Sequence, residues 1–314
     1  MNNSAPVWVS ERADPQFDVV GLGENSLDRT VALEEFPTPG SKWPLAEMGQ
    51  QAGGQVASAL LGCARLGLQG AYLGVIGDDA AGQGALAPLR AEGLNLSGVT
   101  VCQGAHTRSA LILVRQSDGE RSVLEERDPA LIYETGEEAT RLIERSRLLL
   151  LDATDMKASL WAADVAERNG VPIVLDLDHV FPGVEALLER AQFPVVSDSF
   201  AEAWGGKGDL RSGLERMASS PRCRLPVATC GADGAVARWQ GAWLESPGFS
   251  VAASDTTGAG DAFRAGFIWA LLNGETVDQV LRIANAVAAL SCTATGAQAG
   301  LPRRLDLDVF LSSG

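Results

Sequence analysis

The second half of the sequence, from Ser146 onward, alternates between short apolar runs and segments with helical periodicity. The apolar runs occupy residues 148–151, 173–176, 193–196 and 227–229, and the helical segments between them occupy 160–169, 184–191 and 210–218. Parallel strands joined by crossover helices produce such an alternation, and their helices cover both faces of the sheet. The pattern therefore predicts an α/β fold with three layers and a mostly parallel sheet.

The first half follows the same rhythm with two interruptions. Strands are predicted over 17–23 and 71–77, and helices over 54–66 and 82–92. Residues 30–52 and 100–127 are instead rich in strand-forming segments, and the second piece contains a hairpin turn predicted at Asp118-Gly119. We expect these two pieces to form a small sheet that extends from a single domain of residues 17–310. Residues 1–16 are predicted to be a loose leader.

An excess of acidic residues narrows the range of partners. The chain has 40 Asp and Glu residues against 25 Lys and Arg residues, a formal net charge of −15. This charge repels nucleic-acid phosphates and anionic membrane surfaces, so we expect neither as a partner. Five scattered cysteines without a C-x-x-C pair, and only two histidines, leave little for a zinc site. Free thiols and the lack of a long apolar run predict a cytoplasmic protein.

The segment Asp255-Thr-Thr-Gly-Ala-Gly-Asp261 opens a helix whose residues 262–272 are apolar or glycine except Arg264. The small residues 258–260 leave the N–H groups of the first turn open, and the helix dipole attracts a phosphate to this end. An aspartate at the same place repels that phosphate, unless it takes the proton from a hydroxyl group that attacks it. The alternative is an aspartate that serves only the helix dipole. The complete segment favours phosphoryl transfer.

Extended through Ala-Phe-Arg-Ala-Gly-Phe267, this segment resembles the C-terminal signature of the ribokinase-like, or phosphofructokinase-B (PfkB), carbohydrate kinases. The stretch from Gly53-Gly-Gln-Val-Ala-Ser to Arg-Leu-Gly67 resembles their N-terminal Gly-Gly signature. The resemblance runs from about Val19 to Phe310, with both motifs in the family's order. It implies a ribokinase-like α/β/α domain with a small β-sheet lid, ATP and Mg²⁺ as the phosphoryl donor and its metal, and a homodimer paired through the lid.

The resemblance also implies roles for individual positions. Asp261 resembles the general base, and Gly258, Ala259 and Gly260 resemble the anion hole for the transferring phosphoryl group. The matching substrate-binding positions are Asp28, Gly53, Gly54 and Ser58, and the nucleotide-binding positions are Thr229, Gly231, Gly234 and Asn285. Many members bind a monovalent cation, usually potassium, and the matching positions are Asp255, Thr257, Ser291, Ala294, Gly296 and Gly300.

Two positions depart from the family's pattern. Ser58 stands where the first signature usually has Asn, which shortens one polar contact to the sugar. The family's Asn-x-x-Glu motif, which organises magnesium and phosphates, aligns with Ser197-Asp-Ser-Phe200, so Phe occupies the Glu position and Asp198 is the candidate for the magnesium shell. Sulfofructose kinases look similarly altered at both places. The predicted small sheet carries the basic residues Lys42, Arg108, Arg115 and Arg127. One of them could reach a phosphate or an anionic group of the substrate, but each taken singly is interpreted as a surface charge.

Taken together, the sequence predicts an enzyme that transfers the γ-phosphate of ATP to a hydroxyl group, expected to be primary, of a sugar or sugar derivative. A nucleoside kinase of the same fold is one alternative, because the same scaffold phosphorylates ribosides. A protein that binds sugar and nucleotide without catalysis is the other. Asp261 and the small residues before it favour an enzyme.

Overall fold

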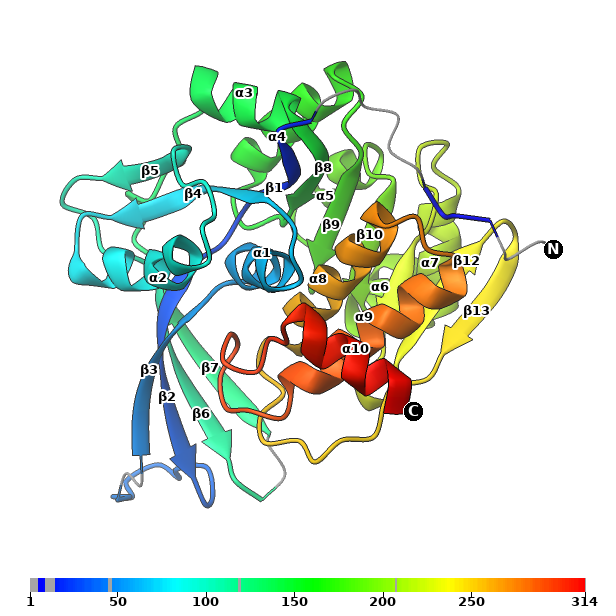
Figure 1. Cartoon of the computed structure of the whole chain (residues 1–314). Coiled ribbons are helices and arrows are strands. Elements are labelled where there is room, and N and C mark those ends of the chain that lie inside the picture. Colours follow the sequence, from blue (N-terminus) through cyan, green and yellow to red (C-terminus); the bar gives the residue numbers. More distant parts are fainter. Residues whose placement is uncertain (1–4, 9–14, 45–46, 118–119, 207, 314) are drawn as a thin grey trace.

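The computed structural model of the chain describes residues 5–8, 15–44, 47–117, 120–206 and 208–313. Its centre is a large twisted sheet whose neighbouring strands are parallel, except where β12 pairs antiparallel with β11 and β13 (Figure 1). In spatial order its strands are β13 (Ala242–Ser246), β12 (Ala235–Trp239), β11 (Val227–Thr229), β10 (Phe193–Ser197), β9 (Ile173–Leu177), β8 (Ser146–Leu151), β1 (Phe17–Leu22), β4 (Gly70–Gly77) and β5 (Val99–Cys102).

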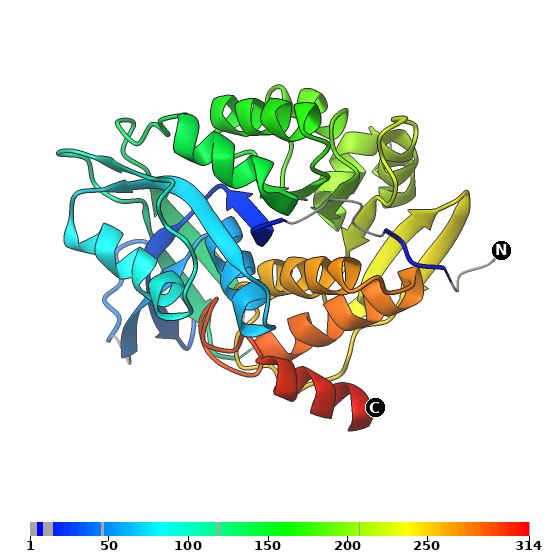
Figure 2. The ribbon, with the colours of Figure 1, turned by 45° about the horizontal axis from the view of Figure 1, so that its top comes forward.

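Helices cover both faces of this sheet, as Figure 2 shows, and the predicted three-layer α/β fold is confirmed. Along β8, Leu148 and Leu150 belong to one hydrophobic core, whereas Leu149 and Leu151 belong to the other. Successive strand residues point to opposite faces, so a continuous apolar run fits a sheet buried on both sides. One face carries α1 (Gln55–Arg65), α2 (Ala80–Ala91), α8 (Ala259–Leu272), α9 (Val277–Ser291) and α10 (Arg304–Ser313). The other carries α3 (Glu137–Glu144), α4 (Met156–Arg168), α5 (Val184–Leu188), α6 (Asp198–Gly205) and α7 (Leu210–Ala218).

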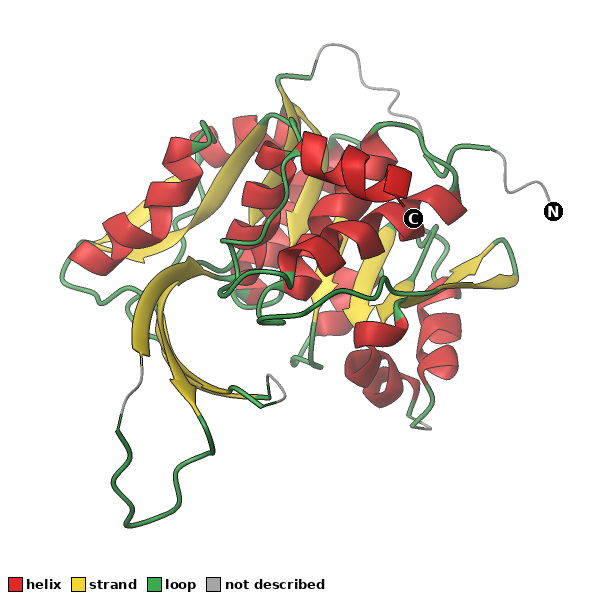
Figure 3. Cartoon of the chain, turned by 60° about the horizontal axis from the view of Figure 1, so that its bottom comes forward, coloured by secondary structure: helices red, strands yellow, loops and turns green. Residues whose placement is uncertain are grey.

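A second, smaller sheet projects from the body and curves strongly (Figure 3). Its strands, in spatial order, are β3 (Glu47–Gly53), β2 (Ser26–Leu33), β6 (Ser109–Arg115) and β7 (Arg121–Glu126). The second piece of this sheet is shorter than the expected 100–127, because β5 pairs with β4 at the edge of the large sheet. The first piece begins before residue 30, at Ser26. The turn predicted at Asp118-Gly119 lies outside the described residues.

The expectation of a loose leader over residues 1–16 is wrong for the part that the structure describes. Val7 is buried, and its N–H group donates a hydrogen bond of 3.1 Å to the carbonyl of Glu275. Pro6 forms an isolated β-bridge with Thr276. The buried side chain of Val7 and these backbone contacts thus attach this part of the N-terminal segment to the loop between α8 and α9. Within the described residues, no helix is long and apolar enough to cross a membrane.

Candidate active site

A cleft of about 820 Å³ lies between the small sheet and the carboxyl ends of the parallel strands. Ala110, Ile112, Val123 and Glu125 line it from the small sheet, and the body contributes residues at the ends of β9, β10 and β11 and at the start of α8. Open α/β sheets place their ligands at this edge, because the loops that follow parallel strands meet there. The cleft therefore joins the two sheets into one candidate site.

The turn that begins α8 opens into this cleft. Gly258, Gly260 and Asp261 line it, whereas Ala259 lies in the same turn without lining the cleft. Gly258 has φ +78°, and a Cβ atom there would lie 2.7 Å from the Ala297 backbone, so the turn requires glycine. Residues 258–261 are partly exposed, although residues 262–272 are buried. The first-turn N–H groups and the Asp261 carboxyl group therefore share one accessible corner.

Several charged groups act on Asp261. Burial and the nearby carboxylates of Asp176, Glu24 and Asp178 raise the pKa of Asp261 well above its ordinary value, while Arg264 acts in the opposite direction. An aspartate with a raised pKa accepts a proton more readily than an exposed one, provided that it is ionised beforehand. This property suits a group that removes a proton from a neutral hydroxyl.

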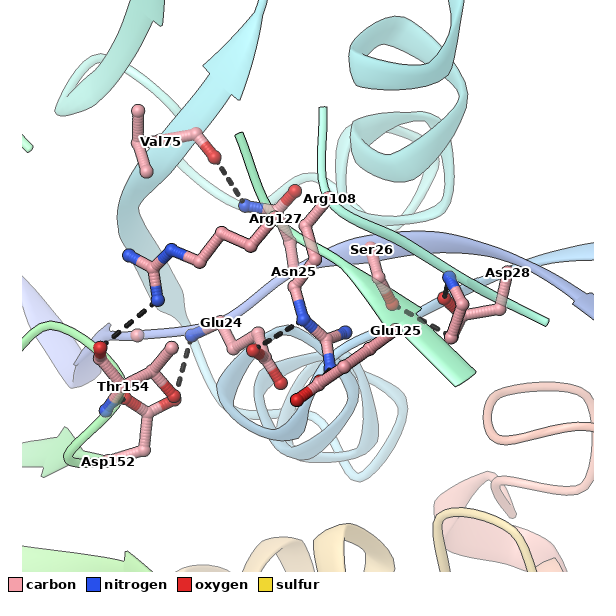
Figure 4. Close-up of polar contacts among 12 residues, drawn as sticks. Glu24, Asn25, Ser26, Asp28, Val75, Arg108, Glu125, Arg127, Asp152 and Thr154 are labelled. Carbon is pink, nitrogen blue, oxygen red and sulfur yellow. Dashed lines mark hydrogen bonds and ion pairs between the residues drawn. The ribbon is translucent and has the colours of Figure 1, made fainter. Parts of the chain in front are cut away.

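Asp28 lines the same cleft from β2. One carboxylate oxygen accepts a hydrogen bond of 2.8 Å from Ser26 Oγ, and the other accepts one of 2.9 Å from the Ala110 N–H group (Figure 4). Burial raises the pKa of Asp28, and these hydrogen bonds and Arg108 oppose the shift. The carboxylate is thus fixed in direction, with lone pairs left for a ligand.

Next to Asp28 is a cluster of charges on both sheets (Figure 4). Arg108 Nε lies 2.7 Å from Glu24, which follows β1, and Arg108 Nη2 lies 2.5 Å from Glu125 on β7. Arg127 Nη1 donates a hydrogen bond of 3.0 Å to the Thr154 carbonyl. All four charged side chains line the cleft. The interpretation as a surface charge is wrong for Arg108, whose side chain is only 14% exposed, whereas Arg127 is exposed. From the sequence alone, Glu24 is not identified as a site residue. The feature that could have indicated it is its position in a Gly-x-Gly-Glu turn directly after a buried strand.

Gly53 and Gly54 lie beside Asp28 and at the cleft, respectively, whereas Ser58 lies in the protein interior. Gly53 ends β3 so close to Asp28 that a side chain would collide with its carboxylate, and Gly54 starts α1 and lines the cleft. Ser58 lies one turn further along α1, is fully buried, and accepts a hydrogen bond of 3.2 Å from Gln298 Nε2. It does not line the cleft, because the helix turns this position towards the protein interior.

The four expected nucleotide-binding residues do not all meet in the cleft. Thr229 lines it from the end of β11. Gly231 and Gly234 bound the short turn that follows this strand. Asn285 is buried in α9, where its side-chain amide donates hydrogen bonds to Ser246 and Pro247. Asn285 therefore holds the chain that follows β13 in place and does not line the cleft.

The residues expected around a potassium ion do come together behind the turn. One oxygen of the buried Asp255 carboxylate accepts a hydrogen bond from the Thr257 N–H group, and the other accepts one from the Gly296 N–H group, both 2.8 Å long. Gly300 packs against the Ser291 carbonyl, which leaves no room for a side chain. Ala294 lies in the loop between them. Thr257 Oγ1 is buried without a hydrogen-bond partner, so these loops have an oxygen available for a cation.

The expected magnesium residue is less well placed. Asp198 starts α6 on the surface, and its carboxylate accepts a hydrogen bond from the N–H group of Ser199. Phe200, at the position where a Glu was expected, is fully buried and stacks on Trp204. Among the described residues no group of three or more acidic, Cys or His side chains could hold a metal ion.

The fold and the cleft define an α/β enzyme with its ligand site at the carboxyl edge of a parallel sheet. The family described as pfkB family carbohydrate kinase matches residues 16–304, and the chain belongs to that family. It is therefore a carbohydrate kinase, a phosphotransferase with an alcohol group as acceptor.

Individual relatives cover nearly the whole chain. A ribokinase of Haemophilus influenzae is 27% identical over 296 residues, which span 92% of this chain and 97% of that protein. An ATP-dependent ribose-1-phosphate kinase of Halopiger xanaduensis is 28% identical over 94% of this chain and 98% of that protein. The structure of Arabidopsis thaliana ribokinase, 22% identical, superposes with a TM-score of 0.81 over 94% of this chain and 98% of that one. The last comparison shows the ribokinase fold.

Proposed function

We propose that the protein transfers the γ-phosphoryl group of ATP to a primary hydroxyl group of a sugar or sugar derivative held between Asp28 and Asp261. One observation carries this proposal: a single cleft presents a fixed carboxylate from the small sheet and a second carboxylate beside an open helix N-terminus. The Arabidopsis ribokinase of the same fold was solved with ribose and ATP, which supports both ligands.

In this mechanism Asp261 takes the proton from the acceptor hydroxyl as its oxygen attacks the γ-phosphorus atom. The new O–P bond forms in line with the bond that breaks, and ADP leaves with the electron pair of that bond. The N–H groups of residues 258–260 face the negative charge of the transferring group, and the helix dipole adds to their effect. Asp28 orients the sugar by accepting hydrogen bonds from its hydroxyl groups, which places the reacting hydroxyl near Asp261.

The small sheet supplies the wall that separates this reaction from water. Ile112 and Val123 are paired in register and line the cleft, so closure over a sugar would place apolar groups where water would otherwise compete as acceptor. On the neighbouring register pair, Leu111 and Leu124 are exposed. A second copy of the chain covering this sheet would bury them, so we propose a homodimer, which the mass in solution by light scattering tests.

For the cofactors, we propose that ATP lies along the turn that follows Thr229, with its phosphates directed to the start of α8. Mg²⁺ neutralises phosphate charge when it is bound with ATP, and we propose Asp198, which directly follows β10, as an acidic residue for its shell. Potassium would be held by the loops around Asp255 and Thr257. An ion there would keep residues 254–257 and the Gly296 loop in fixed positions beside the turn.

The proposal is tested by measuring ADP release with a panel of sugars, sugar acids, sulfosugars, sugar phosphates and nucleosides, in the presence of Mg²⁺ and K⁺. We expect ADP release that depends on one class of acceptor, and the phosphorylated product identifies the hydroxyl group. Selective turnover of nucleosides would replace the sugar by a nucleoside. ATP and sugar binding without turnover across the panel would contradict the proposed transfer.

A further inference from the structure

Arg264 is the one charged residue in the apolar segment 262–272 of α8, and it lies one turn beyond Asp261. Only 3% of this residue is exposed. Arg264 Nη2 lies 2.9 Å from the carboxylate of Asp176 on β9 and donates a hydrogen bond of 3.1 Å to the Val195 carbonyl on β10. A buried guanidinium is unfavourable unless it is paired. The Asp176 carboxylate balances its positive charge, and the hydrogen bond to the Val195 carbonyl holds it in position.

This buried pair lies directly beside the phosphate-binding turn. A Cβ atom added to Gly260 would come within 2.8 Å of Arg264 Nη1, so the guanidinium lies beside Gly260. Arg264 and Asp176 both line the cleft. The positive charge is therefore adjacent to the N–H groups that face the transferring phosphoryl group.

The pair is also incompletely satisfied. Within the described part of the chain, Arg264 Nε and Asp176 Oδ2 are buried without a hydrogen-bond partner. A pair that served stability alone would be replaced at little cost by apolar side chains, because burying two charges is expensive. Buried polar atoms without partners need another explanation, and their position in the cleft points to the reaction.

The surrounding charges make a fixed cation necessary at this point. Asp176 on β9 and Asp178 directly after it act on Asp261 as negative charges, and Arg264 on its own helix opposes them. Transfer brings further negative charge to the same turn, since the phosphoryl group and the attacking oxygen both approach it. Without Arg264, the carboxylates at this end of the cleft would repel both.

We infer that Arg264 is a positioning residue for phosphoryl transfer: fixed by Asp176 and Val195, its guanidinium stabilises the negative charge that gathers at the turn of residues 258–260. Arg264 acts through this turn and needs no contact with either substrate. The inference rests on the proposed function, because it assigns the phosphoryl group to this turn.

The test compares Arg264→Lys, Arg264→Met and the double variant Arg264→Met with Asp176→Asn. The single Met variant leaves Asp176 buried without a partner and is expected to lose stability, whereas the double variant removes both charges and is expected to fold. For the double variant we expect kcat to fall about 10²-fold, with little change in KM for ATP, as for the loss of one anion-stabilising group. The Lys variant keeps the charge and should retain part of the rate.

A second measurement does not depend on the acceptor. Aluminium fluoride with ADP and Mg²⁺ resembles a transferring phosphoryl group, so it should tighten ADP binding to the wild-type protein. This tightening should be lost in the double variant, while the affinity for ADP alone stays unchanged. A matched control removes the pair Arg147–Asp18, 2.8 Å apart, whose Arg147 donates a hydrogen bond to the Leu272 carbonyl at the other end of α8. Arg147→Met with Asp18→Asn should leave both measurements at wild-type values.

Two results would overturn the inference: a folded double variant with wild-type kcat, or one in which aluminium fluoride still tightens ADP binding. Either would make the pair a purely structural link between β9 and α8. Failure of the proposed function has a different signature. The wild-type protein would then turn over no acceptor, while the aluminium fluoride measurement would still decide the role of Arg264.

Discussion

Arg108 joins the small sheet to the body of the molecule through Glu24, 2.7 Å from its Nε atom, and to the neighbouring strand through Glu125, 2.5 Å from Nη2. Only 14% of its side chain is exposed. Because Glu24 belongs to the body and Glu125 to the small sheet, one guanidinium fixes the sheet at the sugar end of the cleft. The orientation of Asp28, which lies on the same sheet, depends on this link.

We therefore expect Arg108→Met to raise KM for the sugar about 10-fold, a loss of about 1.4 kcal/mol in binding, with a smaller change in kcat. The matched control is Arg115→Met on the same strand, because Arg115 pairs with Glu35 and Glu120, away from the cleft. Steady-state kinetics on both variants check this expectation. Equal effects of the two substitutions would show that the small sheet needs its charges only for folding.

Glu24 makes stability depend on pH. Burial raises the pKa of Glu24 from 4.5 to about 8, against the effect of Arg108. The folded state therefore holds this proton more tightly than the unfolded state, so the stabilisation is complete below pH 4.5 and is lost as the pH rises towards 8. In the variant Glu24→Gln the side chain has nearly the shape of a protonated glutamate and stays uncharged at every pH. We expect the two proteins to melt alike near pH 5, and the wild type to melt several degrees lower near pH 9; a constant difference in melting temperature would contradict the assignment.

The main features of the fold could be predicted from the sequence because they depend on local patterns. The apolar runs of the parallel strands and the small residues before Asp261 are visible in a single stretch of chain. The sugar end of the cleft depends on contacts between distant residues instead: Glu24 and Arg108 are separated by 84 positions, and their pairing follows from the placement of the small sheet. From the sequence alone, Arg108 is recognised as a charged residue on a strand, but its partner Glu24 is not.

Ser58 and Asn285 show a second limit. Both occur in motifs with family resemblance, and both lie on helices, where a turn of 100° per residue decides whether a side chain faces a ligand or the core. Ser58 is hydrogen-bonded to Gln298, and Asn285 is hydrogen-bonded to the backbone at the end of β13. The motif places the helix near the site, but helix packing decides which of its residues reach it.

Asp261→Asn tests the general base. We expect kcat to fall by roughly 10²–10⁴ with ATP affinity nearly unchanged, because the amide cannot accept the proton. Asp278→Asn is the control, since Asp278 also occupies the first turn of a helix but is exposed on α9. A role limited to the helix dipole would give similar small losses of stability in both variants and no loss of kcat. Single-turnover kinetics with saturating ATP separate these outcomes.

Removing potassium should slow the reaction. The buried Thr257 Oγ1 atom without a partner and the Asp255 bonds to two loops suggest that an ion completes this region. At constant ionic strength, replacing K⁺ by choline should lower kcat at least about 10-fold and lower the melting temperature, because an ion that binds only the folded state stabilises it. Thr257→Val should reduce the response to K⁺. Identical rates and melting curves in the two salts would exclude a functional ion at this site.

The two ends of α8 allow a test of how closely the phosphate-binding turn must fit. Gly258 and Gly274 both have positive φ, +78° and +73°, so alanine at either position costs about 1 kcal/mol of backbone strain. A Cβ atom at Gly274 meets nothing within 4 Å, whereas one at Gly258 would lie 2.7 Å from the Ala297 backbone.

We expect Gly274→Ala to lose only stability, by about 1 kcal/mol, with unchanged kcat. Gly258→Ala should lose more stability and at least about 10-fold in kcat, because the turn must move away from the Ala297 loop and its N–H groups would no longer point into the cleft. Equal stability and equal rates in the two variants, by thermal unfolding and steady-state kinetics, would show that this turn tolerates displacement and does not set the position of the phosphoryl group.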